Sequence, residues 1–228
     1  QNNKIFSCSY VEPYNFYRFE LHLSVMYFVK SPFFLRWLYP KSIWHMSRTE
    51  KKVYLTFDDG PIPEITPFIL DILKKYQVKA TFFCVGENIK KNPHLFQRIL
   101  QEGHQVGNHT YNHLKGWETN DTTYLDNIVQ CQELTQTNLF RPPYAKAKKT
   151  QLKKLYKNYR VVMWDIMSGD FDQSLSPEKC LQNVLTNIQN GSIIIFHDNI
   201  KAIPRVKYAL PKTIEFLLAN QYQIERLE

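Results

Sequence analysis

Cysteine and glycine are scarce in this sequence, and it has no internal repeat and no low-complexity segment. Its 228 residues include four cysteines and seven glycines, and 43% of them are hydrophobic, enough to bury a core. The cysteines form no Cys-x-x-Cys pair, and a chain of this length needs no disulfide framework. Cysteine is therefore not expected to carry metal chemistry, and its usage leans towards a reducing compartment.

Acidic residues are outnumbered by basic ones. The chain has 29 Lys and Arg against 21 Asp and Glu, a formal net charge of +8. A positive field of this kind favours polyanions such as nucleic acid, acidic glycans or anionic membranes. The basic residues are spread along the chain, however, and the densest run, 146–157, falls where a surface helix is expected. Because no nucleic-acid-reading motif accompanies it, we expect a solvated basic surface and no nucleic-acid partner.

Long apolar runs are also missing, even from the aromatic-rich first 50 residues. Glu20, His22 and Lys30 interrupt the apolar stretch there, which leaves it too short to span a bilayer and unlike a signal peptide. We expect an irregular N-terminal extension over 1–50, and a catalytic domain over 51–228. A location in the cytoplasm or at the periphery of a membrane is favoured.

Two further expectations concern the extension. Met26 is a candidate for the natural start of the chain, which would make the 25 residues before it non-native. Residues 1–50 are expected to pack on the domain. The alternative is a peripheral membrane contact through Phe33, Phe34, Trp37 and Arg36.

Strand-like and helix-like segments alternate from residue 51 onward. Strands are predicted over 53–57, 80–85, 105–109, 139–141, 160–164, 192–197 and 222–227. Helices are predicted over 64–76, 93–103, 121–138, 150–157, 176–189 and 206–219. Strict alternation of this kind implies an α/β fold with a parallel sheet and outer helices, either open or closed into a barrel.

Polar side chains recur at the carboxyl ends of these predicted strands. They are Asp58, Asp59, His109, Arg141, Asp165 and His197. Active sites of βα-barrels and open α/β sheets form at that edge, whereas structural polar residues would not be expected to choose one edge repeatedly.

His109 and His113 have the spacing of a metal-binding pair. Two imidazoles four residues apart can converge on one ion, and one aspartate from Asp58 and Asp59 would complete three ligands. Three protein ligands and an open position are typical of catalytic zinc sites, whereas structural sites have four. Buried or surface histidines at this spacing are also common, and Asp-Asp-Gly-Pro alone is an ordinary turn sequence.

Arg141 and His197 offer two further functional groups at the same edge. The guanidinium fork of Arg141 suits a carboxylate partner, although a surface ion pair is the simpler interpretation. His197 ends a buried apolar strand and could be structural. Asp165 could orient it, since an imidazole that transfers protons usually has a carboxylate behind it.

Together these segments resemble the polysaccharide deacetylase family, carbohydrate esterase family four. The resemblance covers about residues 51–227 and depends on five ordered motifs, at 56–61, 109–113, 141–144, 164–171 and 195–197. It implies a distorted (β/α) barrel with about seven parallel strands.

The resemblance implies a metal site and a base. Asp59, His109 and His113 would hold the metal, which is usually zinc in this family. Asp58 would be the general base that activates water, and Arg141 would hold Asp58 in place.

It also implies groups that stabilise and protonate the reacting atoms. The backbone N–H of Tyr144 would stabilise the oxyanion. His197 would protonate the leaving amine, with Asp165 oriented against it. Ile195 and Phe171 would border the pocket for the acetyl methyl, and Tyr144 would contact the substrate there.

Two positions depart from the family's usual motifs. The fourth motif often ends in Asp-Trp, whereas here it ends in Asp170-Phe171, and Ile195 stands where Leu is frequent. That motif also holds two aspartates. We prefer Asp165 over Asp170 as the partner of His197, because it directly follows a predicted strand.

These residues predict hydrolysis of an N-acetyl group from an amino sugar of a polysaccharide such as peptidoglycan or chitin. An amine leaves poorly unless it is protonated, so both a base and an acid are needed, and this sequence offers both. An O-acetyl glycan esterase or a small-molecule amidohydrolase would use the same groups. A glycan-binding protein with a vestigial site predicts loss of Asp58, Arg141 or His197, all of which are present. The glycan and the oligomeric state, monomer or otherwise, stay open.

Overall fold

The computed structural model describes residues 27–228 of the protein. The suggested start at Met26, the aromatic residues before it and Cys8 lie outside the described residues. Among the helices of residues 27–228, none combines the length and the apolar character that crossing a bilayer requires.

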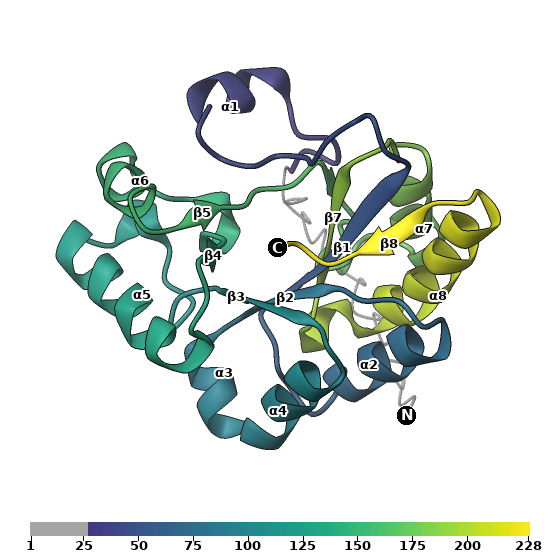
Figure 1. Ribbon diagram of the computed structural model, residues 1–228, viewed down its shortest axis with the longest axis horizontal. Coiled ribbons are helices and arrows are strands. Elements are labelled where there is room, and N and C mark those ends of the chain that lie inside the picture. Colours follow the sequence, from purple (N-terminus) through teal and green to yellow (C-terminus); the bar gives the residue numbers. More distant parts are fainter. Residues whose placement is uncertain (1–26) are drawn as a thin grey trace, which may run out of the picture.

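Eight strands within the described residues form one curled, all-parallel sheet (Figure 1). They are β1 (Lys52–Asp58), β2 (Thr81–Cys84), β3 (Gln105–Asn108), β4 (Leu139–Phe140), β5 (Arg160–Val161), β6 (Ile166–Met167), β7 (Ser192–His197) and β8 (Gln223–Glu225). The order across the sheet is β5-β4-β3-β2-β1-β7-β6, and β8 pairs with the beginning of β1. The predicted α/β fold with a distorted parallel barrel is confirmed.

Helices cover the outer side of this sheet (Figure 1). They are α2 (Thr66–Lys75), α3 (Gly86–Lys91), α4 (Pro93–Gln101), α5 (Asp121–Thr135), α6 (Lys149–Leu155), α7 (Pro177–Leu185) and α8 (Ile203–Ala219). A short helix, α1 (Phe33–Leu38), precedes the sheet, and 3-10 turns occur at Gly116–Glu118, Pro143–Ala145 and Ile200–Ala202.

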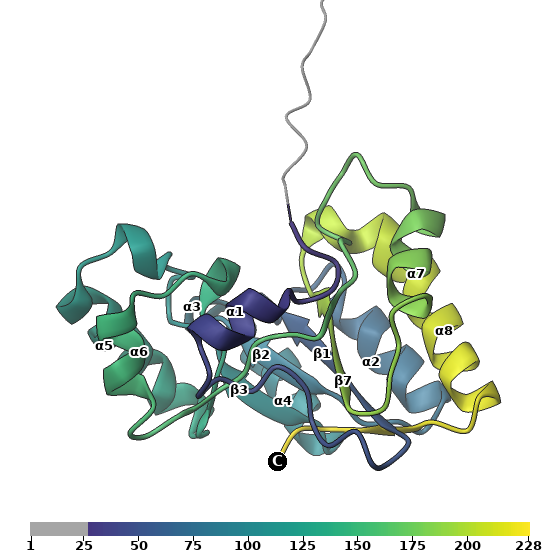
Figure 2. The same ribbon diagram turned by 90° about the horizontal axis from the view of Figure 1, so that it is seen from above.

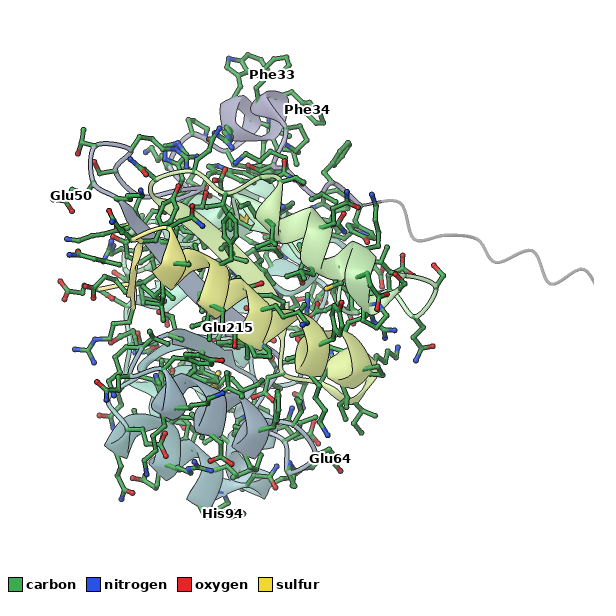
Figure 3. All side chains as sticks on the ribbon, turned by 90° about the vertical axis from the view of Figure 1, so that its right-hand side faces the viewer. Phe33, Phe34, Glu50, Glu64, His94 and Glu215 are labelled. Carbon is green, nitrogen blue, oxygen red and sulfur yellow. The ribbon has the colours of Figure 1, made fainter. Side chains whose placement is uncertain are left out.

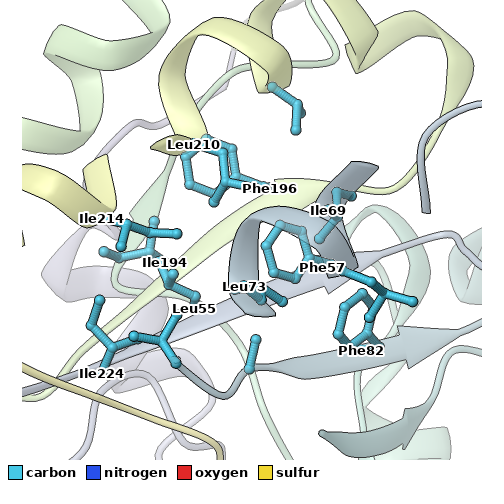
Figure 4. Close-up of a cluster of buried hydrophobic side chains, with 14 of the residues drawn as sticks. Leu55, Phe57, Ile69, Leu73, Phe82, Ile194, Phe196, Leu210, Ile214 and Ile224 are labelled. Carbon is cyan, nitrogen blue, oxygen red and sulfur yellow. The ribbon is translucent and has the colours of Figure 1, made fainter. Parts of the chain in front are cut away.

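The two faces of β1 show how the sequence separates core from site. Phe57 is in register with Phe82 of β2 and Phe196 of β7, and the three rings stack at centroid distances of 5.0 and 6.2 Å. Side chains alternate along a strand, so Phe57 faces the outer helices while Thr56 and Asp58 face the inside of the curled sheet. Figure 4 shows the outer cluster, which α2 and α8 complete.

The N-terminal segment, residues 27–50, fills the gap between the two edge strands, β5 and β6. Ile43 pairs with Val162 beyond the end of β5, and Lys30 pairs with Ile166 in β6. Helix α1 lies across the same opening (Figures 1 and 2). The strand predicted over 160–164 is shorter than expected. Val162 still donates to Phe140 of β4, but Met163 donates to Ile43 of this segment instead of to a strand of the main sheet. The division of the chain at residue 50 stays a prediction.

Three of the described helices and strands were not predicted: α1, α3 and β6. Helix α3 begins directly after β2, at Gly86, and a Cβ at that position would lie 2.5 Å from the Tyr111 ring. Strand β6 has only two residues and begins two residues after the end of the strand predicted over 160–164, so the sequence pattern did not separate the two. Its omission had a consequence for the site, because it changes which aspartate reaches His197.

Candidate active site

The carboxyl ends of β1, β3, β4 and β7 bring the predicted polar residues together. Asp58 is the last residue of β1 and is in register with His197, the last residue of β7. His109 follows β3, and Arg141 follows β4. Neighbouring parallel strands end at one edge, so the side chains converge although they are up to about 140 residues apart in the chain.

Asp59, His109 and His113 form a cluster that can hold a metal ion. Their ligand atoms lie within 4.8 Å of one another. Asp59 Oδ1 is 3.0 Å from His113 Nε2 and 3.6 Å from His109 Nε2. Ligands about 2.0–2.2 Å from a tetrahedral zinc ion are about 3.3 Å apart, so this donor set fits such an ion with a position left open.

His109 is fixed in the form that a metal needs. Its Nδ1 donates a hydrogen bond of 2.7 Å to the carbonyl oxygen of Arg141, which leaves the lone pair of Nε2 directed at Asp59. Burial lowers the pKa of His109 to about 4, so the ring is neutral at physiological pH. The backbone is unusual here too, because Asp59 and His113 have φ values of 83° and 56°, the left-handed region in which residues at functional sites are often held.

A separate carboxylate, Asp58, is held by the buried guanidinium of Arg141. Arg141 Nη1 donates to Asp58 Oδ1 at 2.7 Å and to Thr56 Oγ1 at 2.8 Å. Nη2 donates to the carbonyl oxygen of Met163 at 2.9 Å, and the guanidinium lies 4.1 Å from the centre of the Phe83 ring. Arg141 is 2% exposed. It therefore has one fixed orientation, and it is not the surface ion pair that the sequence left open.

His197 is backed by Asp170, and the preference for Asp165 was wrong. His197 Nδ1 lies 2.7 Å from Asp170 Oδ1, and the backbone N–H of His197 donates to Asp170 Oδ2 at 2.6 Å. Burial alone would lower the pKa of His197, but the charge of Asp170 and its hydrogen bond raise it to about 9. At neutral pH the imidazole is therefore protonated, as a proton donor must be.

The short strand β6 explains the error. Asp165 precedes β6 and is level with Ile193 near the beginning of β7, because its N–H donates to the Ile193 carbonyl oxygen. After β6 the chain turns at Gly169, where φ is 79°, and brings Asp170 to the carboxyl edge. Asp165 thus lies at the wrong end of β7 to reach His197.

Asp165 instead holds the N-terminal segment in place. It is fully buried and accepts hydrogen bonds from Lys30, Arg36 and Arg48, each at 2.9 Å, and from Ser192 at 2.6 Å. Burial raises the pKa of such a carboxyl, but the Ser192 hydrogen bond and Lys30 outweigh it, so the pKa of Asp165 lies below its ordinary value.

Aromatic side chains border the site. The Phe171 ring meets His197 edge-on at a centroid distance of 5.0 Å, and the Tyr27 ring meets Phe171 in the same way at 5.0 Å. Tyr144 is 55% exposed, has φ of 57°, and its ring is 4.7 Å from His113. Ile195 is almost completely buried, so its place in an acetyl pocket stays a prediction, as do the other assigned roles.

Three nearby residues were not singled out from the sequence. Asn199 donates from Nδ2 to Asp59 Oδ2 at 2.6 Å. Asp198 is buried, accepts from Thr66 Oγ1 with both carboxylate oxygens, and lies so close to Gly60 that a Cβ there would be 1.9 Å from Asp198 Oδ2. Tyr27 precedes the expected domain. Only the first two carry a sequence signal, since they directly follow His197.

Metal-dependent hydrolysis uses three ligands that leave one position of the ion open, a carboxylate beside them, and a histidine oriented by a second carboxylate. The site has all of these groups, which places the protein in the hydrolase class. Residues 45–163 match the family model described as polysaccharide deacetylase, and the chain belongs to that family.

Several known proteins of this kind are similar to the chain. A peptidoglycan-N-acetylglucosamine deacetylase of Bacillus cereus is 40% identical over 153 residues, 64% of this chain and 55% of that protein. A second one from the same organism is 32% identical over 187 residues, 79% of this chain and 88% of its own length. The chain thus spans about half the length of the first relative and most of the second.

Solved structures agree with the fold. The crystal structure of the Bc1960 peptidoglycan N-acetylglucosamine deacetylase superposes with a TM-score of 0.79 at 34% identity, covering 86% of this chain and 95% of that one. A pseudoenzyme of the same family from Bacillus anthracis superposes with a TM-score of 0.71 at 26% identity, covering 82% and 67%. The fold alone therefore does not guarantee activity.

Proposed function

We propose that the protein removes the N-acetyl group from N-acetylglucosamine residues of peptidoglycan. The observation that carries the proposal is the pair of positioned groups beside the Asp-His-His cluster: Asp58 held by Arg141, and His197 backed by Asp170. A protein that only binds a glycan or a metal has no need of both. The names of the two Bacillus cereus relatives support peptidoglycan as the glycan.

The roles follow from the chemistry of an amide. A divalent ion held by Asp59, His109 and His113 would polarise the acetyl carbonyl and lower the pKa of water from 15.7 towards roughly 7. We propose zinc, because two imidazoles and one carboxylate are ligands that it prefers. Asp58 accepts the proton of the attacking water, and Arg141 keeps the Asp58 carboxylate directed at it.

Two other groups act on the oxygen and the nitrogen of the amide. The backbone N–H of Tyr144 donates to the oxygen on which charge develops, a contribution on the order of 3 kcal/mol for one such donor. His197 gives its proton to the departing amine. Asp170 orients the His197 ring and stabilises its protonated form, while Phe171 limits the space beside it for the acetyl methyl.

Acetate release tests this function. The protein is incubated with peptidoglycan fragments, chitin oligomers and O-acetylated xylan, with and without a chelator, alongside Asp58→Asn as the matched control. We expect acetate from the N-acetylated substrates, loss with chelator, recovery with zinc, and none from the variant. Acetate from xylan alone would favour the esterase. Glycan binding without acetate release would make the protein a pseudoenzyme like its Bacillus anthracis neighbour.

A further inference from the structure

Helix α1 presents large apolar side chains to solvent. Phe33 is 84% exposed and Trp37 is 81% exposed, and they are four residues apart on one side of the helix. Figure 3 shows Phe33 and Phe34 projecting from the molecule, at the opposite end from His94. Exposed aromatic side chains gathered in one place mark interaction sites more often than chance allows.

Contacts with the domain hold this helix in place. Arg36 donates to the buried Asp165, and Leu35 packs against a cluster that contains Trp44 and Trp164. Phe33 and Trp37 therefore stay turned away from the domain, and they do not pack on its core.

Lysines lie next to Leu38, at the end of the same helix. Lys41, Lys149 and Lys153 line a surface depression together with Leu38 and other residues between α1 and α6. Residues 28–49 contain no Asp or Glu, and residues 145–160 contain six Lys, one Arg and no acidic residue. Exposed aromatic groups beside a one-sign cluster of lysines are the composition of segments that lie on anionic membranes.

We infer that this aromatic-basic face, formed by Phe33, Phe34, Trp37 and Leu38 with the three lysines, docks on an anionic lipid surface. Residues 1–26 are a poorer occupant, because their two basic residues, Lys4 and Arg18, are balanced by Glu12 and Glu20. A second copy of the chain, which also has a net charge of +8, would be repelled. Lipid headgroups supply the negative charge, and the acyl boundary accepts the aromatic rings.

Vesicle binding tests the inference with the full chain. Vesicles of equal parts phosphatidylglycerol and phosphatidylcholine are compared with phosphatidylcholine alone, by sedimentation and by tryptophan emission. We expect binding to the anionic vesicles only, weaker at high salt, with a blue shift from Trp37. A lysine near an anionic surface contributes roughly fivefold in affinity, so Lys149→Gln with Lys153→Gln should weaken binding about 25-fold.

Three variants separate the outcomes. Phe33→Ser with Trp37→Ser should abolish binding and the blue shift. Lys74→Gln with Lys75→Gln, which removes the same charge from exposed positions of α2, should change affinity less than twofold. The inference is overturned if anionic vesicles do not bind, if the α2 control weakens binding equally, or if the aromatic variant still binds through residues 1–26. Conversion of a lipid-free dimer to a monomer by the aromatic variant would overturn it too.

A second inference concerns Asn199 and depends on the proposed metal site. Asp59 directs Oδ1 towards the two imidazoles, and Asn199 Nδ2 donates to the other oxygen, Oδ2, at 2.6 Å. Asn199 is itself fixed, because its Oδ1 accepts from the backbone N–H of Ala202 at 3.1 Å. We infer that Asn199 is a positioning residue that sets which oxygen of Asp59 faces the ion.

Metal affinity measures this directly. Asn199→Ser retains an oxygen to cap the turn at Ala202 but is too short to reach Asp59. We expect zinc affinity, measured by calorimetry, to fall about 10- to 100-fold, as for other outer hydrogen bonds to metal ligands, with unchanged unfolding of the metal-free protein. Asn120→Ser, at the remote N-cap of α5, is the matched control. Unchanged affinity, or equal loss in the control, contradicts the inference. This readout does not depend on whether acetate is released.

Discussion

The Asp170 carboxylate holds His197 at two points, with Oδ1 2.7 Å from the ring Nδ1 and Oδ2 2.6 Å from the backbone nitrogen. This arrangement fixes the ring plane and leaves Nε2 as the nitrogen that can give a proton to a leaving group. It also raises the pKa of the imidazole to about 9, although burial acts in the opposite direction.

The pH dependence of deacetylation should therefore change in Asp170→Asn. His197 can donate a proton only below its pKa, so the rate falls as the pH rises through that value. Removal of the Asp170 charge lowers the pKa, which moves this alkaline limb of kcat/KM to lower pH. A pH profile on an N-acetylated oligosaccharide checks the shift. Glu178→Gln, which removes an exposed charge at the start of α7, should leave the limb in place.

Asp58→Asn should abolish deacetylation while bound metal is largely retained. Asp58 contacts Arg141 and is not part of the Asp-His-His cluster, so its loss removes a proton acceptor and not a ligand. General-base groups contribute about 10²–10⁴-fold, which sets the expected fall in kcat. Kinetics and elemental analysis of the same preparation test both statements. Full turnover in the variant would remove Asp58 from the role of base.

His113→Ala should lose metal and activity together. The Nε2 atom of His113 is 3.0 Å from Asp59 Oδ1, and without it two of the three donors remain. Zinc content after dialysis and acetate release should fall in parallel. His94→Ala on the exposed surface of α4 controls for the loss of an imidazole elsewhere (Figure 3). Unchanged zinc content in the first variant would contradict the ligand assignment.

The loss of hydrolysis rate in His197→Ala should depend on the leaving group of the substrate. An amide nitrogen must be protonated to depart, whereas the phenolate of an activated acetyl ester leaves without a proton. We expect about 10²–10⁴-fold loss on the amide and much less on the ester. Parallel rates on an N-acetylated oligosaccharide and on nitrophenyl acetate give the comparison. Equal loss on both substrates would count against a leaving-group acid.

The sequence predicted this site where the hydrophobic pattern located the end of a strand. Asp58 and His197 end β1 and β7, and their register followed from parallel pairing. Strand β6 comes directly after the strand predicted over 160–164 and was not separated from it, so the choice between Asp165 and Asp170 depended on a strand that was not recognised. Contacts between distant segments, such as Ile43 with Val162, leave no local signal at all.

Asp165→Ala should loosen the segment that closes the gap between β5 and β6. Asp165 is fully buried, and its removal leaves Lys30, Arg36 and Arg48 without their shared carboxylate. Removal of one partner from a buried pair destabilises by about 3–5 kcal/mol, and we expect about 3 because the three cations are partly exposed. Urea unfolding at neutral pH measures this loss, and hydrogen exchange should show reduced protection of residues 29–46.

The pH dependence of stability gives the prediction for Asp165→Ala a second test. The pKa of Asp165 in the folded protein lies below its ordinary value. Its contribution to the free energy of unfolding is therefore complete at pH values well above the ordinary pKa, and it declines as the pH falls through the folded pKa. The stability difference between wild type and Asp165→Ala should therefore shrink in acid. Asp71→Ala, which removes an exposed partner of Arg98, should cost under about 1 kcal/mol at any pH. A difference between wild type and Asp165→Ala that stays constant into strong acid would show that lost packing, and not the charge of Asp165, secures the segment.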